Sequence, residues 1–261
     1  MISKHALRPA VLLLACLSCT TVPVTGRKEL NLVGEGTMNQ LGAQTYTQEL
    51  AKAKPSSDAA ATAMVQAVAK RIADAAESNF HPGYQWQVTL IDDTKTVNAW
   101  CLPGGKIAVY SGILPLTKDE SGLAVVLAHE TAHALAHHGA ERISRSQLMQ
   151  VGESGILAAV GAAKPEAVQT VGAALGLGAQ LGVELPFSRA QESEADHIGL
   201  VLMAKAGYDP EKAVEFWQRM TAYGQGKQAP AFLSDHPSDA DRVAAIQREM
   251  PEAKASFVAH K

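Results

Sequence analysis

The pentapeptide His129-Glu130-Thr131-Ala132-His133 lies near the middle of this 261-residue chain. Two histidines four residues apart on a helix lie one turn apart on the same face, so both imidazoles can reach one metal ion. Glu130 lies beside them, where its carboxylate can take a proton from a water on that metal. A surface helix with two ordinary histidines would carry the same letters, so the surrounding sequence has to decide between the two interpretations.

The residues ahead of the pentapeptide predict a buried helix. Thr117 and Glu120 form a T-x-x-E capping box directly before the apolar run of residues 123–128. A run that is apolar on nearly every side indicates a helix inside a core. We expect this helix to end at His138, with Gly139 as its C-cap. The motif then falls in the middle of a core helix, which disfavours the surface interpretation.

The flanking sequence predicts a mainly helical domain with a small sheet. Helical patterns cover residues 37–54 and 57–78, whereas residues 84–91 alternate as a strand does. A second strand, residues 106–110, follows the Pro103-Gly104-Gly105 turn. These patterns predict an α+β fold, mainly α-helical, in which a small β-sheet or hairpin lies next to the HExxH helix.

Further helices are predicted in the second half of the chain. One begins at Ser188, which forms an S-x-x-Q capping box with Gln191, and stops at Gly207. Residues 148–185 are rich in Gly and Ala, but each apolar half is shorter than the about 20 residues that a membrane span needs. Helix packing through small residues, or a mobile flap over the site, are the two interpretations of that segment. Two more helices begin further on, at Asp209-Pro210 and, after His236-Pro237, at Ser238.

Two histidines do not complete a catalytic zinc site, which usually has three protein ligands and a water. The metzincin pattern would require Gly at position 136 and His at position 139, where this chain has Ala136 and Gly139. On a rigid helix His137 lies too far along to share the ion, and His138 points elsewhere. We interpret these two histidines as a basic helix C-terminus that interacts with the helix dipole.

Glu192 is the stronger candidate for the third ligand. It lies 59 residues after His133, at the start of a capped helix, with Asp196 one turn later on the same face. One of these carboxylates can bind zinc while the other accepts the N–H of a ligating histidine and fixes its tautomer. Glu194 points to a different face and is predicted to be structural or solvent-facing. The sequence therefore predicts a gluzincin-like site for one Zn²⁺ per chain.

The first residues resemble a targeting segment rather than part of the fold. Lys4 and Arg8 precede a short apolar stretch, residues 11–17, that cannot span a bilayer as a helix. The following residues resemble a bacterial lipobox, with Cys19 as the lipidated cysteine and Cys16 as the alternative. An uncleaved anchor or a plain secretory signal are the other interpretations.

Composition excludes some classes of partner. The net charge of −3 provides no basic stripe, so nucleic acid is not expected to bind. Beyond the leader Cys101 is the one remaining cysteine, so an internal disulfide cannot form. Because it lies between Trp100 and Leu102, we predict a buried structural thiol and not a nucleophile.

Several segments resemble the CAAX-prenyl-protease/HtpX-type zinc metallopeptidases. The similarity covers residues 26–250, and the lipobox-like leader and the lack of spanning helices resemble the soluble periplasmic branch of the LoiP and BepA type. The predicted organisation is a lipoprotein-type signal peptide, a tether, a zinc metallopeptidase domain and a tail, at residues 1–18, 19–35, 36–250 and 251–261. The segments that carry the resemblance are His129-Glu130-x-x-His133, Ser188-Arg189-x-x-Glu192-x-Glu194-Ala195-Asp196, His236-Pro237-Ser238 with Arg242, and Asn98 to Gly105.

The resemblance implies roles for the residues of the site. Glu130 would act as the general base. His236 is the candidate donor to the oxyanion, with an inhibitory fourth metal ligand or a structural His-Pro turn as alternatives. The resemblance implies that zinc is bound by His129, His133 and Glu192, and that Asp196 bonds to a ligand.

The strand of residues 106–110 is predicted to lie beside the site. An extended substrate could add to its edge through main-chain hydrogen bonds, with little sequence selectivity. We therefore expect an endopeptidase that acts on unfolded or misassembled envelope proteins in the periplasm, held at the outer membrane by an N-terminal lipid and without a transmembrane helix in the mature chain. A periplasmic chaperone or assembly factor with weak or latent proteolysis, and a protein with purely structural zinc, are the alternatives. The predicted substrate residues are Lys106, Ile107, Ala108, Val109 and Tyr110.

Overall fold

The computed structural model describes residues 19–145, 188–225, 230–236 and 241–258. The predicted signal peptide, Cys16 and the Gly/Ala-rich segment of residues 148–185 lie outside these ranges. The chain divides into two units, and each is described by itself. The smaller one contains residues 19–21, 28–34 and 139–145 of the described part, and the larger one contains the rest.

In the smaller unit, β1 (Cys19–Thr21) pairs antiparallel with β2 (Lys28–Leu30). Residues 139–145 of this unit are helical. The main-chain N–H of Leu32 donates to Ser144 Oγ at 2.8 Å. The segment predicted as a tether therefore contains a pair of short strands.

The larger unit contains a three-stranded sheet in the order β3-β5-β4. Its strands are β3 (Gln87–Ile91), β4 (Ala99–Leu102) and β5 (Lys106–Tyr110). β5 runs parallel to β3 and antiparallel to β4. Because both edges of β5 are paired, the prediction that a substrate adds to the edge of residues 106–110 is wrong. The strand β4, which the sequence pattern did not reveal, forms one edge of the sheet.

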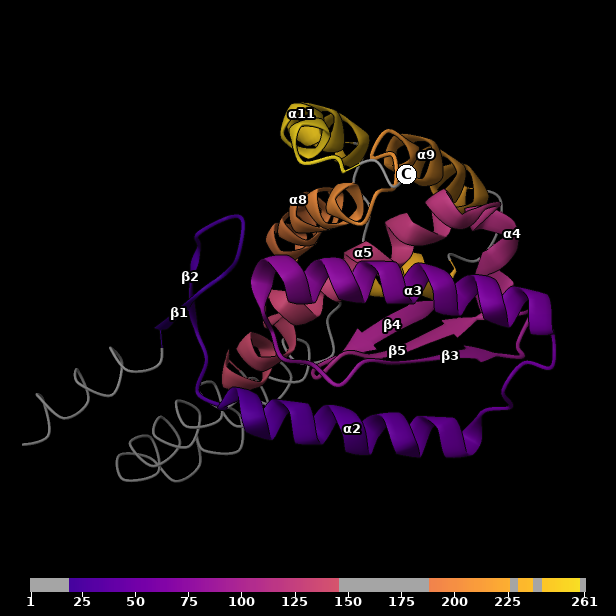
Figure 1. Ribbon diagram of the computed structural model, residues 1–261, viewed down its shortest axis with the longest axis horizontal. Coiled ribbons are helices and arrows are strands. Elements are labelled where there is room, and N and C mark those ends of the chain that lie inside the picture. The colour runs from indigo at the N-terminus through magenta and orange to yellow at the C-terminus, as the bar shows by residue number, and fades with distance from the viewer. Residues whose placement is uncertain (1–18, 146–187, 226–229, 237–240, 259–261) are drawn as a thin grey trace, which may run out of the picture. The chain divides into compact units, whose positions relative to one another are not determined.

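Helices cover both faces of this sheet (Figure 1). One face lies on α2 (Glu35–Lys52), and the other is covered by α3 (Ala59–Phe80) with α5 (Glu120–Leu135). The Asp58 side chain caps α3 by accepting the N–H of Ala61 at 2.9 Å. Val65, Val68 and Ile72 lie at helical spacing on α3 and are fully buried against the core.

The helix α5 is buried from Gly122 to Leu135, which confirms the prediction of a core helix around the motif. Its N-cap differs from the prediction. Asp119 caps the helix by accepting the N–H of Gly122 at 2.8 Å, whereas Thr117 ends the preceding short helix α4 (Leu114–Thr117), which follows the 3-10 turn η1 (Ser111–Ile113). Asp119 acts as the N-cap because its carboxylate lies within hydrogen-bond reach of the first free N–H groups of the helix.

The predicted end of this helix at His138 and Gly139 is also wrong. The helix α5 stops at Leu135, and His137 adopts the left-handed conformation with φ +50°. The chain is then helical again over residues 138–145, so Gly139 lies inside a helix and caps none.

The second half of the larger unit packs against α5. The helix α8 (Arg189–Lys205) begins with the predicted capping box of Ser188 and Gln191. It approaches α5 so closely that a Cβ on Gly199 would lie 3.2 Å from the backbone N and Cα of His129. The remaining helices are α9 (Lys212–Gly224), α10 (Ala231–Asp235) and α11 (Arg242–Ala255). Ser238, the predicted cap of the last helix, lies outside the described residues.

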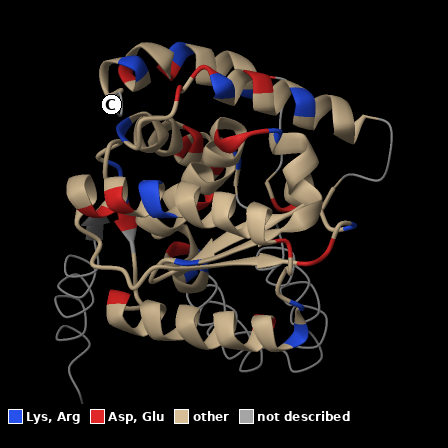
Figure 2. Ribbon diagram, turned by 45° about the vertical axis from the view of Figure 1, so that its right-hand side comes forward, with Lys and Arg blue, Asp and Glu red and all other residues tan. Residues whose placement is uncertain are grey.

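The architecture confirms the predicted α+β, mainly helical fold with a small sheet beside the HExxH helix. Acidic and basic residues are interspersed over the helices and loops, and the strands carry few of them (Figure 2). Among the helices in the described ranges, none has the length and apolar character that a membrane crossing requires.

Candidate metal centre

Three helices bring four candidate ligands together inside the larger unit. His129 and His133 lie on α5, Glu192 on the first turn of α8, and His236 directly after α10. One ligand atom from each of these residues lies within 4.8 Å of the others, and all four side chains are buried. The structure therefore assembles the three predicted ligands and brings His236 to the same point.

The spacing of these atoms fits a tetrahedral metal ion. His129 Nε2 lies 3.1 Å from His133 Nε2 and 3.2 Å from His236 Nδ1. Glu192 Oε1 lies 3.0 Å from His236 Nδ1 and 3.4 Å from His133 Nε2. Ligands at the usual Zn–N distance in a tetrahedron lie about 3.3 Å apart. Ring nitrogens that face one another at this distance repel unless a cation or proton lies between them, so the geometry suits a bound cation.

The electrostatics of the cluster suit the same interpretation. Burial favours the neutral form of Glu192, but hydrogen bonds with the three histidines outweigh it and hold its pKa well below the usual range. Burial lowers the pKa of His133, which keeps that imidazole neutral. The pKa of His129 is raised in spite of burial, because Asp196 and Glu192 favour its charged form. The ionised carboxylate of Glu192 and the neutral imidazole of His133 are the forms that bind metals, whereas His129 would release its proton when a metal binds.

Glu130 faces the cluster from the same helix. Its Oε1 lies 3.3 Å from His236 Nε2, and its side chain is buried. Burial raises the pKa of Glu130 to about 7. A carboxylate with a pKa near neutrality can both accept and release a proton, which is what a general base that later acts as an acid requires.

Cys101 on β4 is a free thiol close to this helix. Burial raises its pKa, and the nearby Glu130 carboxylate raises it further. The thiol is therefore protonated at neutral pH, in line with the prediction of a structural cysteine and not a nucleophile.

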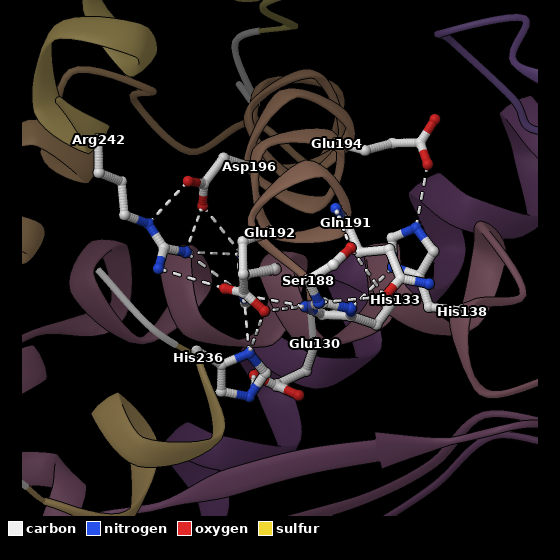
Figure 3. Close-up of polar contacts among 11 residues, drawn as sticks. Glu130, His133, His138, Ser188, Gln191, Glu192, Glu194, Asp196, His236 and Arg242 are labelled. Carbon is white, nitrogen blue, oxygen red and sulfur yellow. Dashed lines mark hydrogen bonds and ion pairs between the residues drawn. The ribbon is translucent and has the colours of Figure 1, made fainter. Parts of the chain in front are cut away.

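Asp196 and Arg242 lie together on one side of the cluster, beside Glu192 (Figure 3). Asp196 Oδ1 lies 3.0 Å from His129 Nδ1. Arg242 Nη2 donates to Asp196 Oδ1 at 2.7 Å, and its Nε lies 2.7 Å from Asp196 Oδ2. Arg242 Nη1 lies 3.2 Å from Glu192 Oε2. The guanidinium also lies 3.4 Å above the centre of the Trp217 ring. No role was predicted for Arg242, although two carboxylates one turn apart on a buried helix face require a nearby cation.

His138 and Glu194 occupy the opposite side of the cluster and correct two predictions (Figure 3). His138 is fully buried, with its Nδ1 2.8 Å from His133 Nδ1 and its Nε2 3.0 Å from Glu194 Oε2. It is therefore no part of an exposed basic helix end. Glu194 is buried and not solvent-facing, and it accepts hydrogen bonds from Thr25 Oγ1 at 2.5 Å and Arg27 Nε at 2.7 Å.

Several curated proteins are similar in sequence to this chain. The chain is 43% identical over 178 residues to the mitochondrial metalloendopeptidase OMA1 of Schizosaccharomyces pombe, which covers 65% of this chain and 48% of that protein. It is 32% identical over 244 residues to the mitochondrial metalloendopeptidase OMA1 of Homo sapiens, or 88% of this chain and 46% of that protein. The putative beta-barrel assembly-enhancing protease of Vibrio cholerae is 32% identical over 154 residues, 57% of this chain and 31% of that protein. The chain thus spans about half the length, or less, of the curated relatives that it matches.

These relatives contradict the predicted location. Proteins of two yeasts, a plant and three animals that match this chain are named as mitochondrial. The prediction of a periplasmic protein anchored to the outer membrane is therefore wrong. It depended on the lipobox-like residues of the leader, a short and weakly specific pattern. The narrower assignment to a periplasmic lipoprotein branch is not supported either.

A family-level match covers most of the chain. Residues 59–250 match peptidase family M48, which includes the three helices and the turn that supply the four candidate ligands. This match confirms the prediction of a metallopeptidase from the HExxH motif. The chain belongs to peptidase family M48.

Proposed function

We propose that this chain is a zinc-dependent endopeptidase that cleaves extended segments of unfolded or misassembled proteins, with Glu130 as the general base. The observation that carries this proposal is the convergence of four buried ligand atoms beside a carboxylate whose pKa is raised to about 7. The metalloendopeptidase names of relatives from yeasts, plants and animals support it.

His129, His133 and Glu192 would hold the metal. Three imidazole or carboxylate ligands are typical of catalytic zinc, which supplies a Lewis acid that polarises a peptide carbonyl and lowers the pKa of water toward about 7. Glu130 takes the proton of the attacking water and passes it to the nitrogen of the leaving amine. Asp196 accepts a hydrogen bond from His129 Nδ1–H. This holds the proton on Nδ1, so the lone pair of Nε2 stays free to bind the ion.

The position of His236 supports a role as a fourth ligand. Its Nδ1 lies 3.2 Å from His129 Nε2 and 3.0 Å from Glu192 Oε1, at the corner of the tetrahedron where a catalytic site keeps water. A fourth protein ligand makes a zinc site closed and inactive. This observation favours a resting state, and with it the second candidate function, a chaperone or assembly factor whose proteolysis is latent.

Within the described ranges no strand pairs with the outer edge of β4, and this supports binding of an extended chain there. Asn98 O accepts the N–H of Tyr110 at 3.0 Å, so alternation turns the main-chain groups of Ala99 and Cys101 away from β5. The strand lies against α5, and the N–H of Phe232 already bonds to Val97 O at 3.0 Å on this outer edge. A substrate strand that continues this pairing would gain affinity from main-chain bonds with little sequence selectivity.

Digestion of casein by the purified, zinc-loaded chain tests the proposal. We expect cleavage by the wild type and its loss in Glu130→Gln, which removes the base but leaves all the proposed ligands in place. Equal zinc content of the two proteins is the control that the metal site is intact. Equal cleavage by both would overturn the proposed role of Glu130, and no cleavage by either would favour the latent function.

The variant His236→Ala separates the two roles of that histidine. If His236 is an inhibitory ligand, its removal opens the fourth position and the rate of cleavage rises. If His236 donates to the oxyanion, its removal lowers kcat by about 10²–10³-fold without an equal change in KM. The geometry supports the first outcome.

A further inference from the structure

A continuous hydrogen-bonded chain connects His133 to the N-terminal part of the larger unit. It runs from His133 Nδ1 to His138 Nδ1 over 2.8 Å, and from His138 Nε2 to Glu194 Oε2 over 3.0 Å. Arg27 Nε then donates to the same Glu194 oxygen at 2.7 Å, and Thr25 Oγ1 donates to the other at 2.5 Å. Three segments that are distant in sequence thus meet in one line of contacts.

The hydrogen bonds that join His133, His138 and Glu194 can have only one donor-to-acceptor direction when a metal is bound. His133 Nε2 faces the other ligands, so its lone pair must be free and the proton lies on Nδ1. His138 Nδ1 then accepts a hydrogen bond from His133 Nδ1–H. The proton of His138 itself lies on Nε2, and this N–H donates a hydrogen bond to Glu194 Oε2. Glu194 accepts the hydrogen bond from His138 Nε2 and those from Thr25 and Arg27, which fixes its position against His138.

The turn of residues 22–27 is itself fixed to the larger unit. Val22 is fully buried within its hydrophobic core. The N–H of Val22 donates to Arg27 O at 2.9 Å, and the N–H of Gly26 donates to Val22 O at 3.0 Å. Gly26 supplies the left-handed φ of +68° that closes the turn. Thr25 and Arg27 are therefore held in place by the backbone of this turn.

We infer that the turn of residues 22–27 positions the metal ligand His133, through Arg27, Glu194 and His138. This inference rests on the proposed metal site. A ligating imidazole that lacks a partner on its other nitrogen can rotate and exchange tautomers, which weakens metal binding. His138 is therefore a positioning residue, and Arg27 fixes it by holding the carboxylate that orients it.

The rate of zinc release to an excess of a chelating dye tests the inference in the full-length chain. We expect His138→Gln to release zinc about 10–100-fold faster than the wild type, the usual effect of losing a partner of a ligand. The conservative variant His138→Asn retains an oxygen near the former Nδ1 and should recover part of the slow release. The matched control is His197→Gln, because His197 lies on α8 and bonds to Glu252 at 2.9 Å, away from His133.

Arg27→Gln, which breaks the ion pair with Glu194, should accelerate release by a few-fold, and Lys54→Gln, which breaks a surface ion pair with Asp92 elsewhere, should not change it. If Arg27 acts through His138, the Arg27→Gln change has no further effect in the His138→Gln background. If the double variant releases zinc faster than His138→Gln by the factor that Arg27→Gln shows alone, the inference is overturned. Release from His138→Gln at the wild-type rate would also overturn it. If His138→Gln does not fold, Glu194→Gln replaces it in the same comparison.

Zinc content of the wild type distinguishes a failure of this inference from a failure of the metal site. A wild-type chain that binds no zinc overturns both proposals. A wild type that binds one zinc, with variants that release it at the same rate, overturns the positioning role alone.

Discussion

The two histidines of the motif are supported on opposite sides by different arrangements (Figure 3). His129 bonds directly to Asp196, and Arg242 neutralises that carboxylate. His133 reaches its carboxylate, Glu194, only through a second imidazole, that of His138. Each carboxylate pairs with an arginine: Asp196 with Arg242 on helix α11, and Glu194 with Arg27 in the turn of residues 22–27.

The arginine that supports the His129 side is more deeply buried than the one that supports the His133 side. The side chain of Arg242 is 5% exposed, whereas that of Arg27 is 34% exposed. A charge pair taken out of water is costly to break, because the partner left behind has no solvent, while a pair near the surface is screened. The His129 side should therefore carry most of the stability of the site, and the His133 side should be the one that tolerates change.

Arg242→Gln should have the largest effect. It leaves Asp196 and Glu192 buried without their cation and removes the contact with Trp217. We expect the free energy of unfolding of the zinc-free chain to fall by about 3–5 kcal/mol. Denaturant titration measures it, and Arg248→Gln, an exposed arginine on the same helix, is the control. A loss no larger than that of the control would contradict the assigned role of Arg242.

Asp196→Asn and Glu194→Gln compare the two sides at constant shape. Asp196 touches a ligand and Glu194 does not, so the first should weaken zinc binding by about 10–100-fold and the second by less. Competition with a chelator of known affinity measures both. If Glu194→Gln weakens binding as much as Asp196→Asn or more, the ranking of the two sides is wrong.

Ser188→Ala should act on both sides alike and by a small amount. It removes the N-cap of α8, the helix that carries Glu192, Glu194 and Asp196. We expect a loss of about 1 kcal/mol in the free energy of unfolding, with unchanged zinc affinity. Thermal and chelator titrations of the same preparation check the two parts. A large change in zinc affinity would mean that the cap itself orients the ligands.

Removal of the metal by chelation should have the smallest effect on the fold. The helix α5 is buried along almost its whole length by apolar neighbours, so the apo chain should keep its helices while activity is lost. Far-ultraviolet circular dichroism before and after chelation measures this. Loss of the helical signal would favour the alternative in which zinc is purely structural.

Local spacing explains which parts of the site could be predicted from sequence. His129 and His133, like Glu192 and Asp196, are four residues apart on capped helices, and this spacing alone places each pair on one face. The link through His138 depends on the left-handed backbone conformation of His137. This conformation cannot be predicted from the sequence at a residue other than glycine. The partnership of Arg27 with Glu194 joins positions 167 residues apart, which no local pattern can reveal.

The sheet shows the same limit. The Pro103-Gly104-Gly105 turn indicated a strand at residues 106–110, and β5 has those bounds. Its central position depends on pairing with β4, a short strand of four residues that reads as part of a turn before Pro103. An edge strand and a central strand of this length have similar sequences, so the surface open to substrate could not be assigned from the pattern.

X-ray absorption at the zinc edge of the full-length chain tests the metal site most directly. The account predicts one zinc per chain with nitrogen and oxygen ligands at about 2.0–2.1 Å, and an imidazole signal that corresponds to three histidines and falls to two in His236→Ala. A sulfur ligand at about 2.3 Å, or an imidazole signal unaffected by removal of His129 or His133, would contradict it.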